Sequence, residues 1–169
     1  MSMAQEFDPI RLLHALHERG VLFVVIGGVA ARAHGSPSAT TDLDVCYERS
    51  PANLDRLAQA LRTVHATLRG VEPGLPFRLD ARTLQMGDHF TLVTELGDLD
   101  CLGTPAGTDG FNELSRNAVL VDFDGVAVRF ASLDDLMTMK RAAGRPKDRV
   151  ELEILEALRQ ELDRERESN

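Results

Sequence analysis

The sequence predicts a single α+β domain with a mixed β-sheet flanked by helices, and three observations support this prediction. In the first 70 residues, β-branched apolar runs alternate with segments of helical periodicity. Two pairs of strand-like runs follow, each joined by a short turn that contains glycine. The 169 residues show neither an internal repeat nor a linker, so we expect one domain over 1–169 with its core at about 20–155.

Helix caps, first-turn prolines and glycine stops define the elements of the first half. Asp8-Pro9 and Ser50-Pro51 each precede an apolar helical stripe, and the run VLFVVI ends at a glycine pair, as a buried strand that opens into a turn would. The expected elements are a helix over 9–19, a strand over 21–26, a short helix over 29–34, a strand over 42–47 and a helix from 51 to about 69.

In the second half, hairpin signals precede two helices. Asp124-Gly125 suits a type I′ turn, and Ser132 with Asp135 forms a capping box. The expected elements are a turn-rich stretch over 70–76, a helical turn over 82–85, strands over 89–95 and 98–103, a hairpin over 118–130, a helix from 133 to near Gly144, and a charged helix over 146–164 that frays after about 160.

Composition narrows the functional classes. Lys and Arg number 19 against 27 Asp and Glu, and the net charge of −8 argues against a protein that coats nucleic acid. The longest apolar run, 21–26, is too short to span a membrane, and the start of the chain lacks the features of a secretory signal. We therefore expect a cytoplasmic protein, with Cys46 and Cys101 reduced and buried.

Two carboxylates on one predicted strand are the strongest chemical signal. Asp42 and Asp44 lie two residues apart, so their side chains share a face of the strand. Such a pair is either solvated or binds a cation, and Mg²⁺ prefers oxygen ligands of this kind. The preceding strand ends at Gly27-Gly28, where backbone N–H groups can approach a phosphate. Together these features predict a nucleotide and metal site.

A third acid is expected to complete the metal site. The strand over 98–103 offers Asp98 and Asp100, again on one face. Asp98 adjoins a glycine turn and can be solvated, whereas Asp100 lies in an apolar setting. We therefore favour Asp100, with Asp98 as the alternative.

A cationic cluster follows near the C-terminus. Lys140 and Lys147 are the only lysines of the chain, and Arg141 and Arg145 lie among them. These charges either bind phosphates or decorate a helix end, but Lys140 falls on the core-facing stripe and needs a ligand or counter-ion. Asp148 is its candidate counter-ion, or a base.

These motifs resemble those of the DNA polymerase beta-like nucleotidyltransferase superfamily. The similarity spans about 20–155 and is carried by GG, a short helix ending in AHG, TTDLDV, LDCLG and SLDDLMTMKRAAGRPKD. Within the superfamily the chain looks like the small toxins of the AbiE and mycobacterial MenT type. Two positions depart from the pattern of the superfamily: many relatives have serine at the position of Gly28, and arginine is frequent in the loop at Ser38.

The resemblance implies roles for individual residues. Asp42, Asp44 and Asp100 would bind Mg²⁺, and Lys140 with Asp148 would serve nucleotide transfer. The nucleotide-binding residues would be Gly27, Gly28 and Lys140 by this resemblance, and we add Thr41, which either caps the strand or touches phosphate, and Arg145 of the cationic cluster.

The function expected is Mg²⁺-dependent transfer of NMP from an NTP to a hydroxyl acceptor. By resemblance the acceptor is RNA, at the 3′ end of a tRNA, and the protein is the toxin of a bacterial toxin–antitoxin pair with an antitoxin protein as partner. One alternative is the same chemistry on a small molecule such as an aminoglycoside. Another is a catalytically idle nucleotide-binding module.

Overall fold

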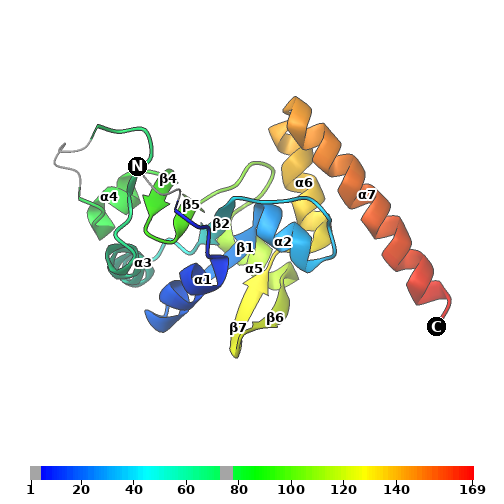
Figure 1. Ribbon diagram of the computed structural model, residues 1–169, viewed down its shortest axis with the longest axis horizontal. Helices are drawn as coiled ribbons and strands as arrows, with labels where there is room; N and C mark the ends of the chain where they lie inside the picture. Colours follow the sequence, from blue (N-terminus) through cyan, green and yellow to red (C-terminus); the bar gives the residue numbers. More distant parts are fainter. Residues whose placement is uncertain (1–4, 73–77) are drawn as a thin grey trace.

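The protein folds as seven helices and one seven-stranded sheet within the residues that the computed structural model describes, 5–72 and 78–169 (Figure 1). The helices are α1 (Pro9–Glu18), α2 (Gly27–Ala33), α3 (Pro51–Thr63), α4 (Ala81–Met86), α5 (Phe111–Asn117), α6 (Leu133–Ala143) and α7 (Pro146–Glu167). The strands are β1 (Phe23–Ile26), β2 (Asp42–Tyr47), β3 (Thr67–Leu68), β4 (His89–Thr94), β5 (Gly97–Leu102), β6 (Val119–Phe123) and β7 (Val126–Phe130).

The sheet is mixed, as predicted. Its strand order is β3-β4-β5-β2-β1-β7-β6. The central strand β2 pairs antiparallel with β1 and parallel with β5, while β4 runs antiparallel to β5. Asp42 lies opposite Asp98 and Asp44 opposite Asp100, so the two acidic strands are neighbours in register. The α+β prediction is confirmed.

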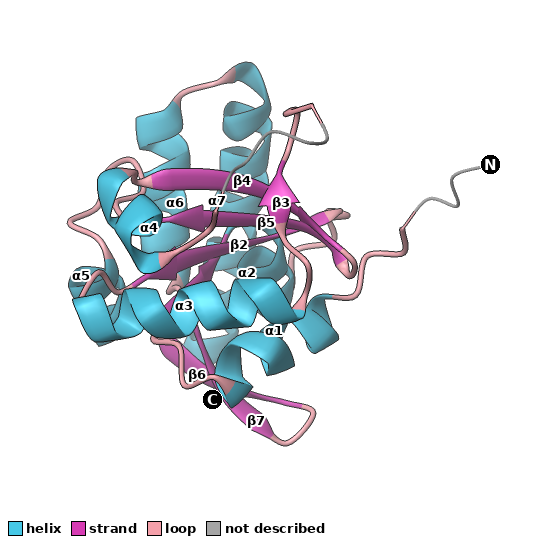
Figure 2. Ribbon diagram, turned by 90° about the vertical axis from the view of Figure 1, so that its left-hand side faces the viewer, coloured by secondary structure: helices cyan, strands magenta, loops and turns pink. Residues whose placement is uncertain are grey.

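Helices cover both faces of the sheet (Figure 2). Helices α1 and α3 lie in front of it, and α2, α6 and α7 lie behind. Leu43 and Val45 of β2 are fully buried, and so is Leu57 of α3. Because side chains alternate along a strand, this pattern sends Asp42 and Asp44 to the opposite face, toward α2. Helix α7 projects away from the rest of the domain (Figure 1).

The predicted caps form as hydrogen bonds. Asp8 Oδ1 accepts from the backbone N–H of Arg11 at 3.0 Å, and Ser50 Oγ accepts from that of Asn53 at 3.3 Å. Ser132 Oγ accepts from the N–H of Asp135 at 3.1 Å. Each bond satisfies a donor that the first turn of a helix leaves free, so the starts of α1, α3 and α6 follow the sequence signals.

The largest differences from the sequence prediction concern three helices. The helix expected to reach residue 69 ends at Thr63, because His65 adopts a positive φ of 53° and residues 67–68 pair with β4 as β3. Helix α5 was not predicted. Helix α7 continues to Glu167, beyond the 164 expected and through the segment predicted to fray. The turn-rich stretch predicted over 70–76 lies partly outside the described residues.

Both cysteines, Cys46 and Cys101, are buried free thiols. Among the helices of the described chain, none is both long and apolar enough to cross a membrane.

Candidate active site

Three carboxylates from two adjacent strands converge on one face of the sheet. Asp42 and Asp44 come from β2 and Asp100 from β5, and one oxygen of each lies within 4.8 Å of the others. The parallel register sets this arrangement, because it places Asp100 directly beside Asp44. The structure therefore brings together the three acids that the sequence analysis selected.

The electrostatics of this cluster fit a divalent cation. The pKa of Asp44 is raised to about 7, first by burial and then by the charges of Asp42 and Asp100, while Lys140 lowers it. Burial also raises the pKa of Asp100, against the lowering effect of Arg69. An all-oxygen donor set of three crowded carboxylates is the ligand chemistry of Mg²⁺. A bound cation would remove the repulsion that raises these pKa values.

Asp98 takes a different position from Asp100. Its Oδ2 lies 3.4 Å from Nε of Arg69, and its side chain is 43% exposed against 17% for Asp100. Arg69 also reaches Asp100, with Nη2 at 3.0 Å from Oδ1. Sequence reasoning did not identify Arg69 as a residue of the site, because it placed residue 69 at the end of a helix rather than beside the sheet.

The glycine pair packs directly against the acidic strand. Gly27 has a φ of +66°, and a Cβ there would collide with the carboxylate of Asp44. A Cβ on Gly28 would lie 2.8 Å from Oγ1 of Thr40, whose hydroxyl donates to the backbone oxygen of Asp42 at 3.0 Å. Thr40 therefore fills the space that a serine side chain at position 28 would need.

On the opposite side of the site, Asp148 organises the cations. It is fully buried and accepts from Lys140 Nζ at 3.3 Å and from Arg145 Nε at 2.7 Å. Hydrogen bonding from Arg145 is the main cause that lowers the pKa of Asp148 to about 2. A general base works best with a pKa near the operating pH, so this environment favours the counter-ion role over the base. Arg141 instead pairs with Glu156 at 3.4 Å.

All nine residues predicted for the site line one cleft of about 440 Å³ between the sheet, α2 and the α6–α7 pair. They are Gly27, Gly28, Thr41, Asp42, Asp44, Asp100, Lys140, Arg145 and Asp148. The cleft is also lined by Lys147 and by His89, which the sequence analysis did not select. His89 lies opposite Leu102 in the β4–β5 register, on the same face as the acids, so only the pairing of strands reveals it.

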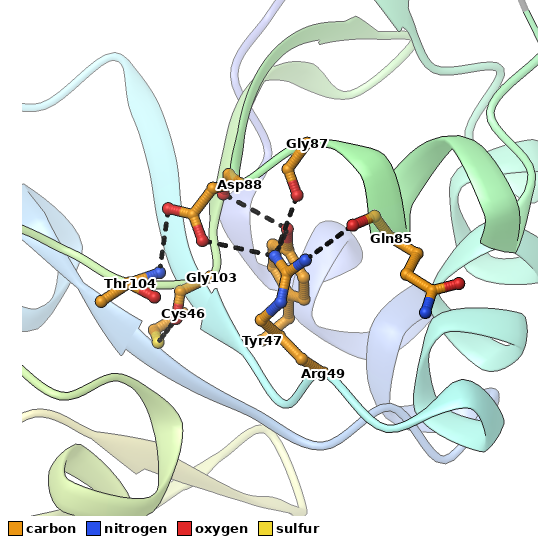
Figure 3. A network of polar contacts seen from close by, with 8 residues as sticks. All are labelled: Cys46, Tyr47, Arg49, Gln85, Gly87, Asp88, Gly103 and Thr104. Carbon is orange, nitrogen blue, oxygen red and sulfur yellow. Dashed lines mark hydrogen bonds and ion pairs between the residues drawn. The ribbon is translucent and has the colours of Figure 1, made fainter.

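Arg49 holds together the backbone segments just before His89 in the sequence (Figure 3). Its guanidinium group donates to the backbone oxygens of Gly87 and Gln85, each at 2.9 Å, and to the hydroxyl of Tyr47 at 3.1 Å. Asp88 accepts from Arg49 at 3.3 Å and from the N–H of Thr104 at 3.2 Å. The network joins the end of β2 to the start of β4 and to the loop after β5.

Comparisons with known proteins identify the fold. Neither the protein-family models nor the curated proteins give a match. The lincosamide antibiotic adenylyltransferase LnuA, solved with lincomycin bound, has a TM-score of 0.61 at 11% identity, over 92% of this chain and 99% of that one. TM1012 of Thermotoga maritima, a candidate nucleotidyltransferase, has a TM-score of 0.57 at 15% identity, over 97% and 99%. ANT(2'')-Ia, in complex with adenylyl-2''-tobramycin, has 0.53 at 16%, over 91% and 94%.

These likenesses define the class of fold. The chain has the single-domain α+β fold of nucleotidyltransferases, and it covers nearly the whole length of each of these neighbours. Because the identities lie between 11% and 16%, the likeness shows the fold alone, and the chemistry depends on the residues of the site.

Proposed function

We propose that the protein is a Mg²⁺-dependent nucleotidyltransferase that moves NMP from an NTP to a hydroxyl acceptor. The observation that carries this proposal is the convergence of Asp42, Asp44 and Asp100 in one cleft with Lys140. The charge of Asp42 raises the pKa of both Asp44 and Asp100, and a crowded cluster of this kind with an amine on the far wall suits a polyphosphate bound with its cation.

The proposed roles follow from position in the cleft. Asp42, Asp44 and Asp100 would hold Mg²⁺, which when bound draws charge from the α-phosphate and the departing pyrophosphate. Gly27 and Gly28 line the cleft at the start of α2, and their backbone N–H groups would lie against the triphosphate. Thr41 is exposed on the loop before β2, and its hydroxyl is available to a phosphate.

The cations of the cleft would neutralise the triphosphate. Lys140 is half-buried, and Asp148 holds its ammonium group in the cleft. Arg145 is bound to the same carboxylate but is 60% exposed, so its remaining N–H donors can reach a ligand. Asp148 would thus act by positioning both cations.

The transfer conserves atoms and charge as follows. The acceptor oxygen forms a bond to the α-phosphorus, the bond from this phosphorus to the β-bridging oxygen breaks, and pyrophosphate leaves. The acceptor's proton passes to a base, and a carboxylate oxygen of the cluster that does not hold Mg²⁺ would be the candidate.

For the acceptor we propose the 3′ end of a tRNA, with the protein as the toxin of a toxin–antitoxin pair in the cytoplasm, where NTPs are available. The motif resemblance at TTDLDV and at KRAAGRPKD supports this choice. An antitoxin protein would be the cognate partner.

A small-molecule acceptor is the second candidate, and two observations favour it. LnuA is an adenylyltransferase of lincosamide antibiotics, and ANT(2'')-Ia was solved with adenylyl-2''-tobramycin. The chain also has no Trp, a single Tyr and a net charge of −8, so it offers few platforms for stacking RNA bases.

Label transfer tests the proposal. Each α-labelled NTP is incubated with total RNA, with aminoglycosides or with lincosamides, with and without Mg²⁺. We expect labelled product that depends on Mg²⁺ and is lost in Asp44→Ala but kept in Asp55→Ala, a control acid exposed on α3. The labelled acceptor distinguishes the two candidates. NTP binding without product in any arm would indicate an idle nucleotide-binding module and contradict the enzyme.

A further inference from the structure

We propose that Arg69 is a positioning residue that holds Asp100, the third carboxylate of the cluster, in its metal-binding orientation. Asp98, in turn, compensates the charge of Arg69. This inference rests on the proposed function, because it assigns a role toward the cation that the three acids would bind. It concerns contacts that lie outside the sequence motifs of the site.

The backbone of Arg69 is fixed beside the acidic strands. Its N–H donates to the carbonyl of Thr91 at 2.9 Å, and Thr91 lies directly opposite Asp100 in the β4–β5 register. Arg69 therefore continues, across β4, the row that runs from Asp44 to Asp100. A side chain that starts from this point passes over Thr91 of β4 and reaches the acids of β5.

Three contacts fix the guanidinium group. Nη2 donates to Oδ1 of Asp100 at 3.0 Å and to the backbone oxygen of Leu92 at 3.0 Å, while Nε lies 3.4 Å from Oδ2 of Asp98. The bond to Asp100 uses one carboxylate oxygen, and the second oxygen keeps its lone pairs for a metal. Two hydrogen bonds and one ion pair hold the planar guanidinium, which restrains the carboxylate of Asp100.

Charge balance explains why two acids meet one arginine. A lone cation next to a metal site would repel the metal, so an uncompensated Arg69 would weaken the site that it orders. The pair of Arg69 with Asp98 has no net charge. Asp98 can therefore cancel the repulsion between Arg69 and the metal while Arg69 still orients Asp100. This gives Asp98 a role although it lies outside the cluster of three acids.

The test uses variants that leave the net charge of the site unchanged. Arg69→Lys keeps the positive charge but loses the planar fork, and the double variant Arg69→Gln/Asp98→Asn removes one charge of each sign. Arg62→Gln, at an exposed position on α3, is the control. Mn²⁺ is the probe, and the free ion is measured by electron paramagnetic resonance in the absence of nucleotide. Thermal unfolding of the metal-free proteins reports whether each variant is folded.

We expect Mn²⁺ to bind about tenfold more weakly to both charge-matched variants, the lower end of the loss seen when partners of metal ligands are removed. Arg62→Gln should bind as the wild type does. Unchanged or tighter binding by either folded variant would overturn the inference, and tighter binding would show that Arg69 competes with the metal. Wild-type protein that binds no more Mn²⁺ than Asp44→Ala would instead refute the proposed function itself.

Discussion

Gly27→Ala should separate the backbone requirement of the glycine turn from its role in the site. At a φ of +66°, an alanine pays a strain of about 1–2 kcal/mol that glycine avoids. The new Cβ would also collide with the carboxylate of Asp44, which must then rotate away from Asp42 and Asp100. The substitution therefore carries both a stability cost and a loss of site geometry.

Gly20→Ala is the matched control, because it introduces the same backbone strain without displacing a carboxylate of the site. Gly20 has a φ of +70°, and the nearest atom to a Cβ there is Arg56 Cδ at 3.8 Å. Both variants should lose about 1–2 kcal/mol, which for a domain of this size lowers Tm by roughly 2–8 °C. Nucleotidyl transfer should fall about 100-fold in Gly27→Ala alone, as expected when a reacting group is displaced by about 1 Å.

The assays are thermal unfolding of the metal-free proteins, Mn²⁺ binding and label transfer from an NTP, each at a temperature where both variants are folded. If Gly27→Ala keeps Mn²⁺ binding and transfer within about threefold of Gly20→Ala, then Asp44 can move without loss. The reasoning that links the glycine turn to the carboxylate cluster would then be wrong.

Three further predictions concern charge and buried polar groups. The pKa of Asp44 is raised in the fold, so the metal-free protein should lose stability as pH rises from about 4 to 7, and Asp44→Asn should flatten this part of a Tm–pH profile. The pKa of Asp148 is lowered to about 2, so its contribution to the free energy of unfolding is present above about pH 4 and lost toward pH 2. Asp148→Asn should remove this part of the Tm–pH profile. It should also raise the KM for NTP, because Lys140 loses its partner. Asn53 is fully buried and binds both backbone groups of Leu22, at 2.7 and 3.0 Å, so Asn53→Ala should cost about 2–3 kcal/mol in urea unfolding while transfer persists below Tm.

The central elements could be predicted because their signals are local. Ser50 and Ser132 start α3 and α6 by capping bonds made within three residues. The residues before Gly27 form a short uninterrupted apolar run, which is typical of a buried strand. Asp42 and Asp44 share a face of β2 through the two-residue repeat alone. For these features the tertiary fold adds nothing that contradicts the local pattern.

The remaining features depend on which strands pair. Apolar spacing up to Leu68 imitates a helix, but hydrogen bonds to β4 at the sheet edge draw residues 67–68 into β3. That change brings Arg69 to the acids, and the pairing of β4 with β5 brings His89 to the cleft. No spacing within the sequence encodes either neighbour, because Arg69 is separated from Asp100 by α4 and β4, and the position of His89 depends on the register of β4 with β5.

Asp44 and Asp148 lie in one cleft in different environments. Asp44 faces two other carboxylates and its pKa rises to about 7, whereas Asp148 accepts from Lys140 and Arg145 and its pKa falls to about 2. At the first acid, burial and like charges outweigh the attraction of Lys140, so it is suited to receive a cation or a proton. The second already has its cations and is suited to hold them. Since acids whose pKa values are shifted in opposite directions mark different tasks, we propose that the wall formed by α6 and α7 would present cations to a polyphosphate, while the sheet would provide the acids that bind its metal.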